Sequence, residues 1–106
     1  MLQYLNQNNF DETLQGNDVV LVDFYADWCG PCKALHPALE VLSQEFDGKA
    51  TIAKVNVDES PELSQQFGVR SIPALFYFKK GEIAGKQIGL QTQTAIANQL
   101  NQLLAN

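Results

Sequence analysis

Runs of apolar residues along the chain predict five β-strands. Residues 19–26 (VVLVDFYA) are β-branched or aromatic at most positions, which is typical of a central strand covered on both faces. Two later apolar segments are separated only by Lys80 and Gly81, a spacing that favours a hairpin. The predicted strands are residues 2–5, 19–26, 51–57, 74–79 and 82–88.

Helices are predicted between these strands from apolar residues spaced three or four positions apart. The longest predicted helix carries one apolar stripe of Leu35, Leu39, Leu42 and Phe46. Pro37 falls within this helix and is expected to kink it, because proline removes one backbone donor. Three shorter helices are expected to begin at the capping residues Asn9, Ser60 and Thr92.

The resulting element order is β-α-β-α-β-α-β-β-α, which belongs to the α/β class. The alternation at the start implies parallel strands with crossover helices, and the late hairpin adds an antiparallel edge. A mixed central sheet flanked by helices on both faces is therefore expected. With 106 residues, 45% of them hydrophobic, the chain is expected to form a single domain over residues 1–106.

Charge and hydropathy disfavour two classes of partner. The net charge is −5 and no basic run is longer than Lys79-Lys80, so a surface that follows nucleic-acid phosphates is not expected. The longest apolar runs have only four or five residues, such as residues 19–22 and 74–78, far fewer than the roughly 18 that span a bilayer. The first ten residues lack the basic start and apolar segment of a secretory signal. A cytoplasmic location without membrane partners is therefore expected.

The only two cysteines, Cys29 and Cys32, lie three positions apart in the segment WCGPC. A disulfide that closes so small a ring contributes only roughly 2 kcal/mol in the loop-entropy model. A structural zinc site needs four ligands, and His36 is the only histidine in the chain. An inert disulfide, a zinc half-site and a binding domain with an idle cysteine pair are the alternatives to a redox function.

The position of the cysteines favours the redox function. Cys29 follows the strand at residues 19–26 and opens the longest helix, and sites in open α/β sheets lie beyond the carboxyl ends of strands. The free amides and partial positive charge of a helix N-terminus favour a thiolate over a thiol. Because the thiolate is the attacking form, Cys29 is the expected nucleophile and Cys32 the resolving cysteine.

Two charged residues interrupt otherwise apolar strands. Asp23 shares a strand face with Leu21 and Tyr25, and a carboxyl buried there has a raised pKa. The functional interpretation is that Asp23 takes the proton from Cys32; the alternative is an aspartate near a strand end that reaches water. Lys54 either moderates the burial of Asp23 or is an exposed surface lysine.

Together these residues resemble the thioredoxin family over nearly the whole chain. The matching segments, in family order, are VDFYADWCGPCK, Lys54 with Asp58, Arg70-Ser71-Ile72-Pro73, the FKKGE hairpin and Gly89. Cys-Gly-Pro-Cys after a tryptophan is a specific motif that looks like the reducing members. The resemblance implies a thioredoxin fold and a general protein-disulfide reductase that works through a reversible Cys29–Cys32 disulfide.

The resemblance also implies roles for residues around the cysteines. Asp23 would be the buried proton acceptor, with Lys54 beside it. Pro73 would be a cis-proline facing the disulfide, although the sequence alone favours a trans bond. The backbone of Ile72 would pair with the client chain. A flat apolar rim that receives partners would consist of Trp28, Gly30, Pro31, Ile72 and Gly89.

The partners that the resemblance implies are disulfide-containing client proteins and thioredoxin reductase, which uses NADPH. The chain itself would bind no cofactor and no metal, and a monomer is expected. Two other functions remain open. One is a thioredoxin-fold binding module whose dithiol is secondary, and the other is a reductant dedicated to a single client.

Three residues depart from the common family pattern. Tyr25 stands where many bacterial members have a second tryptophan, and Ala74 replaces the usual threonine after the proline. His36 lies four residues after Cys32, on the same helical face, where other members often have alanine, serine or lysine. We expect His36 either to be a histidine without catalytic effect or to lie near Asp23 and tune the proton transfer to Cys32.

Overall fold

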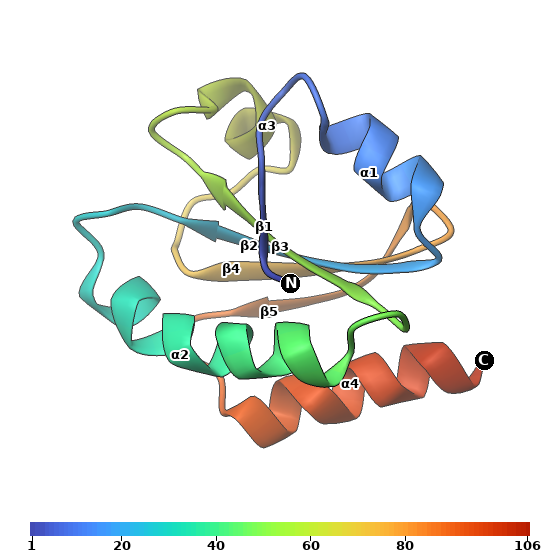
Figure 1. The fold of residues 1–106 in the computed structure, drawn as a ribbon. Coiled ribbons are helices and arrows are strands. Elements are labelled where there is room, and N and C mark those ends of the chain that lie inside the picture. The colour runs from blue at the N-terminus through green and yellow to red at the C-terminus, as the bar shows by residue number, and fades with distance from the viewer.

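The computed structural model describes residues 1–106 and contains nine elements in the predicted order (Figure 1). The strands are β1 (Gln3–Leu5), β2 (Val19–Tyr25), β3 (Thr51–Asn56), β4 (Ala74–Lys79) and β5 (Glu82–Ile88). The helices are α1 (Phe10–Gly16), α2 (Gly30–Glu45), α3 (Pro61–Gln66) and α4 (Gln93–Ala105).

The five strands form one mixed sheet with the order β1-β3-β2-β4-β5. β1 and β2 both run parallel to β3, whereas β4 is antiparallel to β2 and to β5. β2 is therefore the central strand, and its register with β3 places Asp23 directly opposite Lys54. The predicted mixed sheet, with its late antiparallel hairpin, is confirmed.

Helices cover both faces of the sheet, and each face has its own apolar core. α1 and α3 lie on one face and α2 and α4 on the other, as Figure 1 shows. The first core contains Phe10, Leu63 and the β2 residue Val22. The second contains Leu39, Leu100 and further residues from α2, α4 and the sheet. Two cores of this kind require a strand that is apolar on both faces, as β2 is.

The hairpin and the last helix begin as the sequence predicted. Lys80 and Gly81 have positive φ angles of 53° and 82°, the backbone that a two-residue hairpin requires. The Thr92 side-chain oxygen accepts a hydrogen bond of 3.1 Å from the Ala95 N–H and so caps α4.

The other two predicted side-chain caps are wrong. The Asn9 side-chain oxygen accepts from the Asn6 N–H at 2.8 Å, within the turn that precedes α1, and is not available to cap the helix. Ser60 occupies the position before α3 without a side-chain cap. Its backbone carbonyl accepts from the Leu63 N–H at 3.2 Å.

Two strand ends also differ from the prediction, since β2 and β3 each end one residue earlier than predicted. No helix has the length and apolar character needed to cross a membrane.

Candidate active site

Three segments meet at the carboxyl end of β2. β2 leads through Ala26 into the cysteine segment, and β3 leads into the turn that contains Asp58. β4 runs the other way, so its first residues, which follow Pro73, lie at the same edge of the sheet. This topology gathers residues that are about 30 and 40 positions apart in the sequence around Cys29.

Cys29 and Cys32 form a disulfide with their Cα atoms 5.3 Å apart. Cys29 is the N-cap residue of α2, and its Sγ accepts a hydrogen bond of 3.3 Å from the Cys32 N–H. This donor and the helix N-terminus stabilise negative charge on the Cys29 sulfur after reduction. Cys29 is 5% exposed and Cys32 only 1% exposed, so the order predicted from sequence, with Cys29 the more accessible, agrees with the structure.

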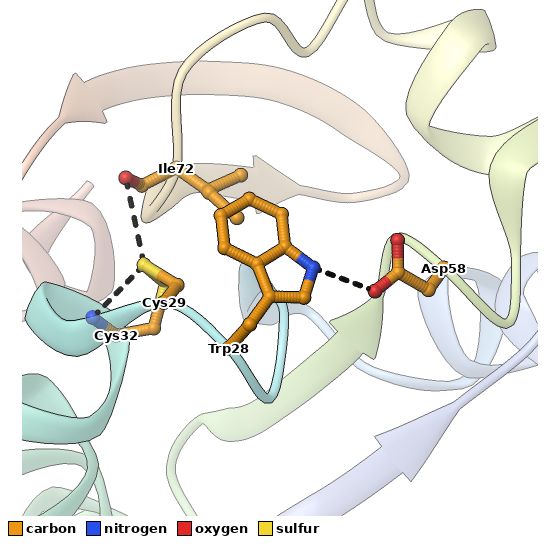
Figure 2. The surroundings of a disulfide bond; sticks show 5 residues. All are labelled: Trp28, Cys29, Cys32, Asp58 and Ile72. Atoms are coloured by element: carbon orange, nitrogen blue, oxygen red, sulfur yellow. Dashed lines mark hydrogen bonds between the residues drawn. A yellow bond between two sulfur atoms is a disulfide. The ribbon is translucent and has the colours of Figure 1, made fainter.

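The loop before β4 lies against the disulfide. The Ile72–Pro73 peptide bond is cis, as the resemblance implied and as sequence alone did not favour. The carbonyl oxygen of Ile72 lies 3.8 Å from the Cys29 Sγ (Figure 2). The Ile72 side chain is half-buried against Ala26 and the two cysteines. The backbone of Ile72 is therefore directly adjacent to the Cys29 sulfur.

Trp28 is held in place by a residue that the motif reasoning did not assign to the site. Its side chain is exposed at 70%, and its indole Nε1–H donates a hydrogen bond of 2.9 Å to an oxygen of Asp58 (Figure 2). The Asp58 turn is fixed in turn by Asn56, whose side-chain oxygen accepts from the Asp58 N–H at 2.9 Å and the Glu59 N–H at 3.2 Å. From the sequence, Asp58 was identified only as one of the residues that match the family pattern. A contact between residues 30 positions apart leaves no local pattern in the sequence from which it could be predicted.

The remaining rim residues lie on the segments that surround the disulfide. Gly30 and Pro31 are exposed at the start of α2. Gly89 follows β5, and its N–H donates a hydrogen bond of 2.8 Å to the Pro73 carbonyl, so it is tied to the cis-proline loop. Trp28 and Ile72 are the other two residues of the predicted rim, and its role in receiving partners stays a prediction.

Asp23 lies fully buried on β2, on the face that α2 and α4 cover. Both of its carboxyl oxygens are buried without a hydrogen-bond partner. Burial raises the pKa of Asp23 to about 7, while the charge of Lys54 acts in the opposite direction. The alternative in which Asp23 reaches water is therefore wrong, because the helices on this face exclude solvent from the carboxyl.

Lys54 is buried beside Asp23 and is not the exposed lysine that the sequence left open. Its Nζ lies 4.1 Å from the centre of the Tyr25 ring and 3.0 Å from Nδ1 of His36. Burial lowers the pKa of Lys54, and the nearby carboxylates, with Asp23 first among them, raise it. The expected contact of His36 with Asp23 is not present as a hydrogen bond; His36 contacts Lys54 instead.

A cavity of about 490 Å³ opens beside Cys32. Cys32, Lys33, His36, Lys54 and Tyr25 are among its lining residues. The cysteines bond to each other, and no group of three or more His, Cys, Asp or Glu side chains is arranged to hold a metal ion.

A disulfide at the N-terminus of a helix, with a cis-proline loop against it and a buried carboxyl in the strand that leads into it, is the arrangement of a dithiol–disulfide oxidoreductase. Comparison with known proteins gives the same answer, since residues 1–102 match the family model described as Thioredoxin. The chain is 43% identical over 100 residues to a thioredoxin from Haemophilus influenzae, covering 93% of this chain and 94% of that protein. The chain belongs to the thioredoxin family and is a protein disulfide oxidoreductase.

Other relatives agree along the full length. The chain is 47% identical over 100 residues to a thioredoxin from Staphylococcus haemolyticus, covering 94% of this chain and 95% of that protein. Its structure is similar to that of a mutant thioredoxin from Halobacterium salinarum, with a TM-score of 0.91 and 39% identity over 97% of this chain and 90% of the other. The thioredoxin fold expected from the resemblance is confirmed.

Proposed function

We propose that Cys29, Cys32 and Asp23 carry out the reduction of client disulfides, with Lys54 adjusting Asp23. The observation that carries this assignment is the position of Cys29 at the N-terminus of α2, with the Cys32 N–H directed at its sulfur. A helix N-terminus and a hydrogen-bond donor both favour the thiolate that disulfide exchange requires. The buried carboxyl of Asp23, on the strand that leads into the cysteine segment, supplies the proposed proton acceptor.

In the first step the Cys29 thiolate attacks one sulfur of a client disulfide. A mixed disulfide forms between Cys29 and the client, the client S–S bond breaks, and the second client sulfur leaves as a thiolate. The Ile72 carbonyl, 3.8 Å from the Cys29 Sγ, lies where the backbone of an extended client segment can pair with it. The exposed rim around Trp28 receives the rest of that segment.

In the second step Cys32 resolves the mixed disulfide. Asp23 accepts the proton of the Cys32 thiol, and the resulting thiolate attacks the Cys29 sulfur. The Cys29–Cys32 disulfide forms, the first client sulfur leaves as a thiolate, and two electrons have passed to the client. An acid whose pKa lies near 7 is suited to accept and release a proton at neutral pH.

The wider setting follows from the family and the composition. NADPH-dependent thioredoxin reductase is the proposed donor that returns two electrons to the Cys29–Cys32 disulfide. We propose a cytoplasmic protein with protein clients and no nucleic-acid or membrane partner. The charge of −5 and the scattered basic residues support the absence of a nucleic-acid partner. We extend the proposal to a single domain over residues 1–106 that acts as a monomer and binds no cofactor.

Turnover of insulin disulfides tests this function. The protein is assayed at catalytic concentration with a thioredoxin reductase and NADPH, beside the Cys29→Ser variant. Turnover that is lost in Cys29→Ser supports the assignment. Turnover with dithiothreitol but not with the reductase would mean that the proposed electron donor is wrong. Absence of turnover with either reductant would refute the proposed reductase chemistry of the site.

The Cys32→Ser variant separates general from dedicated reduction. Without the resolving thiol, the mixed disulfide with Cys29 accumulates and can be isolated from a cell extract. Many trapped proteins are expected for a general reductase. A single trapped protein would establish a dedicated reductant instead.

A further inference from the structure

Glu40, His36 and Lys54 form a row that leads from the surface of α2 to the buried strand β3. Nδ1 of His36 lies 3.0 Å from Nζ of Lys54. Nε2 of His36 lies 3.4 Å from a carboxylate oxygen of Glu40, four residues further along α2. Asp23 continues the row in the neighbouring strand, directly opposite Lys54. The redox mechanism described above uses Asp23 and Lys54 but not His36.

The chemistry of the two contacts assigns the protonation of His36. An ammonium group has only hydrogen-bond donors, so Nδ1 of His36 accepts from Lys54. The ring proton is then on Nε2, the atom that faces Glu40. A protonated imidazole has no free acceptor and cannot make the contact with Lys54. The two contacts therefore form together only when the His36 ring is neutral, and the contact with Glu40 supports the orientation of that ring.

The Lys54 ammonium contacts His36 on α2, and Asp23 has no ion pair. Lys54 forms no salt bridge with Asp23, and both Asp23 oxygens are without a hydrogen-bond partner. The two charges still act on each other, because Lys54 lowers the pKa of Asp23 against the effect of burial. Burial is the larger influence on the Asp23 proton, and the position of the Lys54 ammonium modifies it.

Other side chains of titratable types also face Lys54. These are Tyr4 from β1, Tyr25 and Asp27 from β2 and the loop after it, and Cys32, Lys33 and Glu40 from α2. Asp27 and Glu40 are the carboxylates other than Asp23 that raise the pKa of Lys54. Asp23 differs from them because it is fully buried and lies directly opposite Lys54 in the sheet.

We propose that His36 is a positioning residue that holds the Lys54 ammonium away from the Asp23 carboxyl and so preserves the proton exchange between Asp23 and Cys32. The inference rests on the role proposed above for Asp23. Without the acceptor on His36, the ammonium of Lys54 turns to the buried carboxylate in the adjacent strand. Asp23 is then ionised at lower pH and becomes a weaker proton acceptor for Cys32.

The test is the titration of the Asp23 carboxyl, followed by carbon NMR of the oxidised protein labelled at aspartate. In His36→Leu the midpoint is expected to fall by about 1–3 pH units, the usual effect of an adjacent cation on a carboxyl. In His36→Asn it is expected to stay near that of the wild type, because the amide oxygen can accept from Lys54 where Nδ1 does. His36 is 32% exposed, so these changes leave the apolar core intact.

The lysine variant shows whether His36 acts through Lys54. In a Lys54→Met background, where no ammonium is present, His36→Leu is expected to leave the Asp23 midpoint unchanged. A shift that persists in this background would refute the proposal, since His36 would then act on Asp23 by another route. A wild-type midpoint in His36→Leu would also refute it, as would an asparagine variant that shifts as far as the leucine variant.

These outcomes are distinct from failure of the proposed function. The titration is measured on the disulfide form and does not depend on turnover. A wild-type protein that reduces insulin while His36→Leu titrates normally would overturn only the role of His36. A protein without turnover would overturn the proposed reduction step, whatever the titration shows. If both proposals hold, the pH at which insulin reduction reaches half its maximum is lower in His36→Leu, and it changes with the Asp23 midpoint.

Discussion

Replacing Asp23 by asparagine removes an ionisable group from the most buried part of the site while keeping its size. In the native protein burial raises the pKa of Asp23 from 3.8 to about 7. The unfolded chain exposes the carboxyl to water and restores the lower value. The native state therefore binds this proton more tightly than the unfolded state does.

The sign and size of the effect on stability follow from that difference. Because the native pKa is the higher one, the stabilisation is complete below about pH 4 and is lost as the pH rises to about 7. A shift of roughly 3 units at about 1.4 kcal/mol each amounts to about 4 kcal/mol. That loss is a large part of the roughly 5–15 kcal/mol by which domains are stable.

Guanidinium unfolding of the oxidised wild type and of Asp23→Asn between pH 4 and pH 8 measures the effect. The free energy of unfolding of the variant, minus that of the wild type, is expected to increase by about 4 kcal/mol over this range and to level off above about pH 7. Any fixed cost of burying the amide is the same at every pH and does not alter the change. A difference that stays constant from pH 4 to pH 8 would refute the argument, because Asp23 would then titrate alike in both states.

Three further predictions concern the fold and use the same unfolding measurement. Leu39→Ala is expected to cost about 2–5 kcal/mol, since Leu39 is fully buried in the core under α2 and α4; a cost below 1 kcal/mol would contradict that packing. Gly81→Ala is expected to destabilise the protein by about 1–2 kcal/mol, because Gly81 has a φ of 82° that alanine rarely adopts. Gly16→Ala is expected to stabilise the protein by about 0.5–1 kcal/mol, because the space around the added carbon is open. Equal effects of the two alanines would show that the backbone angle is not the cause. Thr92→Ala is expected to cost about 1 kcal/mol through loss of the α4 cap, and Thr92→Ser to retain most of it.

Features that depend on neighbouring residues were predicted well from the sequence. The Lys80-Gly81 turn needs two residues with positive φ, and its position between two apolar runs identified it. The Thr92 cap followed from a threonine directly before an apolar stripe. Asn9 also lies directly before a predicted helix, but it does not cap that helix. Its side-chain oxygen accepts a hydrogen bond from the backbone N–H of Asn6 instead. Competition between two local hydrogen bonds of this kind is not visible in a pattern of residue types.

Features that depend on how elements pack were left open by the sequence. Alternation placed Asp23 on one face of β2, but its full burial results from the helices that cover that face. The position of Lys54 opposite Asp23 requires the register of β2 and β3, which neither strand determines alone. The contact of His36 with Lys54 depends on the rotation of α2 over the sheet. The sequence indicated what chemistry Asp23, Lys54 and His36 can perform, but it did not indicate which residues each of them contacts.

The two cysteines need opposite surroundings, and the connection from β2 to α2 supplies both. In the proposed mechanism Cys29 meets the client, and it lies where the strand has ended and the helix begins, beside the exposed Trp28. In the same mechanism Cys32 loses its proton within the protein, and one turn into α2 it is 1% exposed. A carboxyl exposed to water would titrate near pH 4 and accept protons poorly at neutral pH. The burial that would suit Asp23 to its proposed role is therefore the same burial that lowers stability above pH 4, so the two properties are expected to change together in any variant that opens this face to solvent.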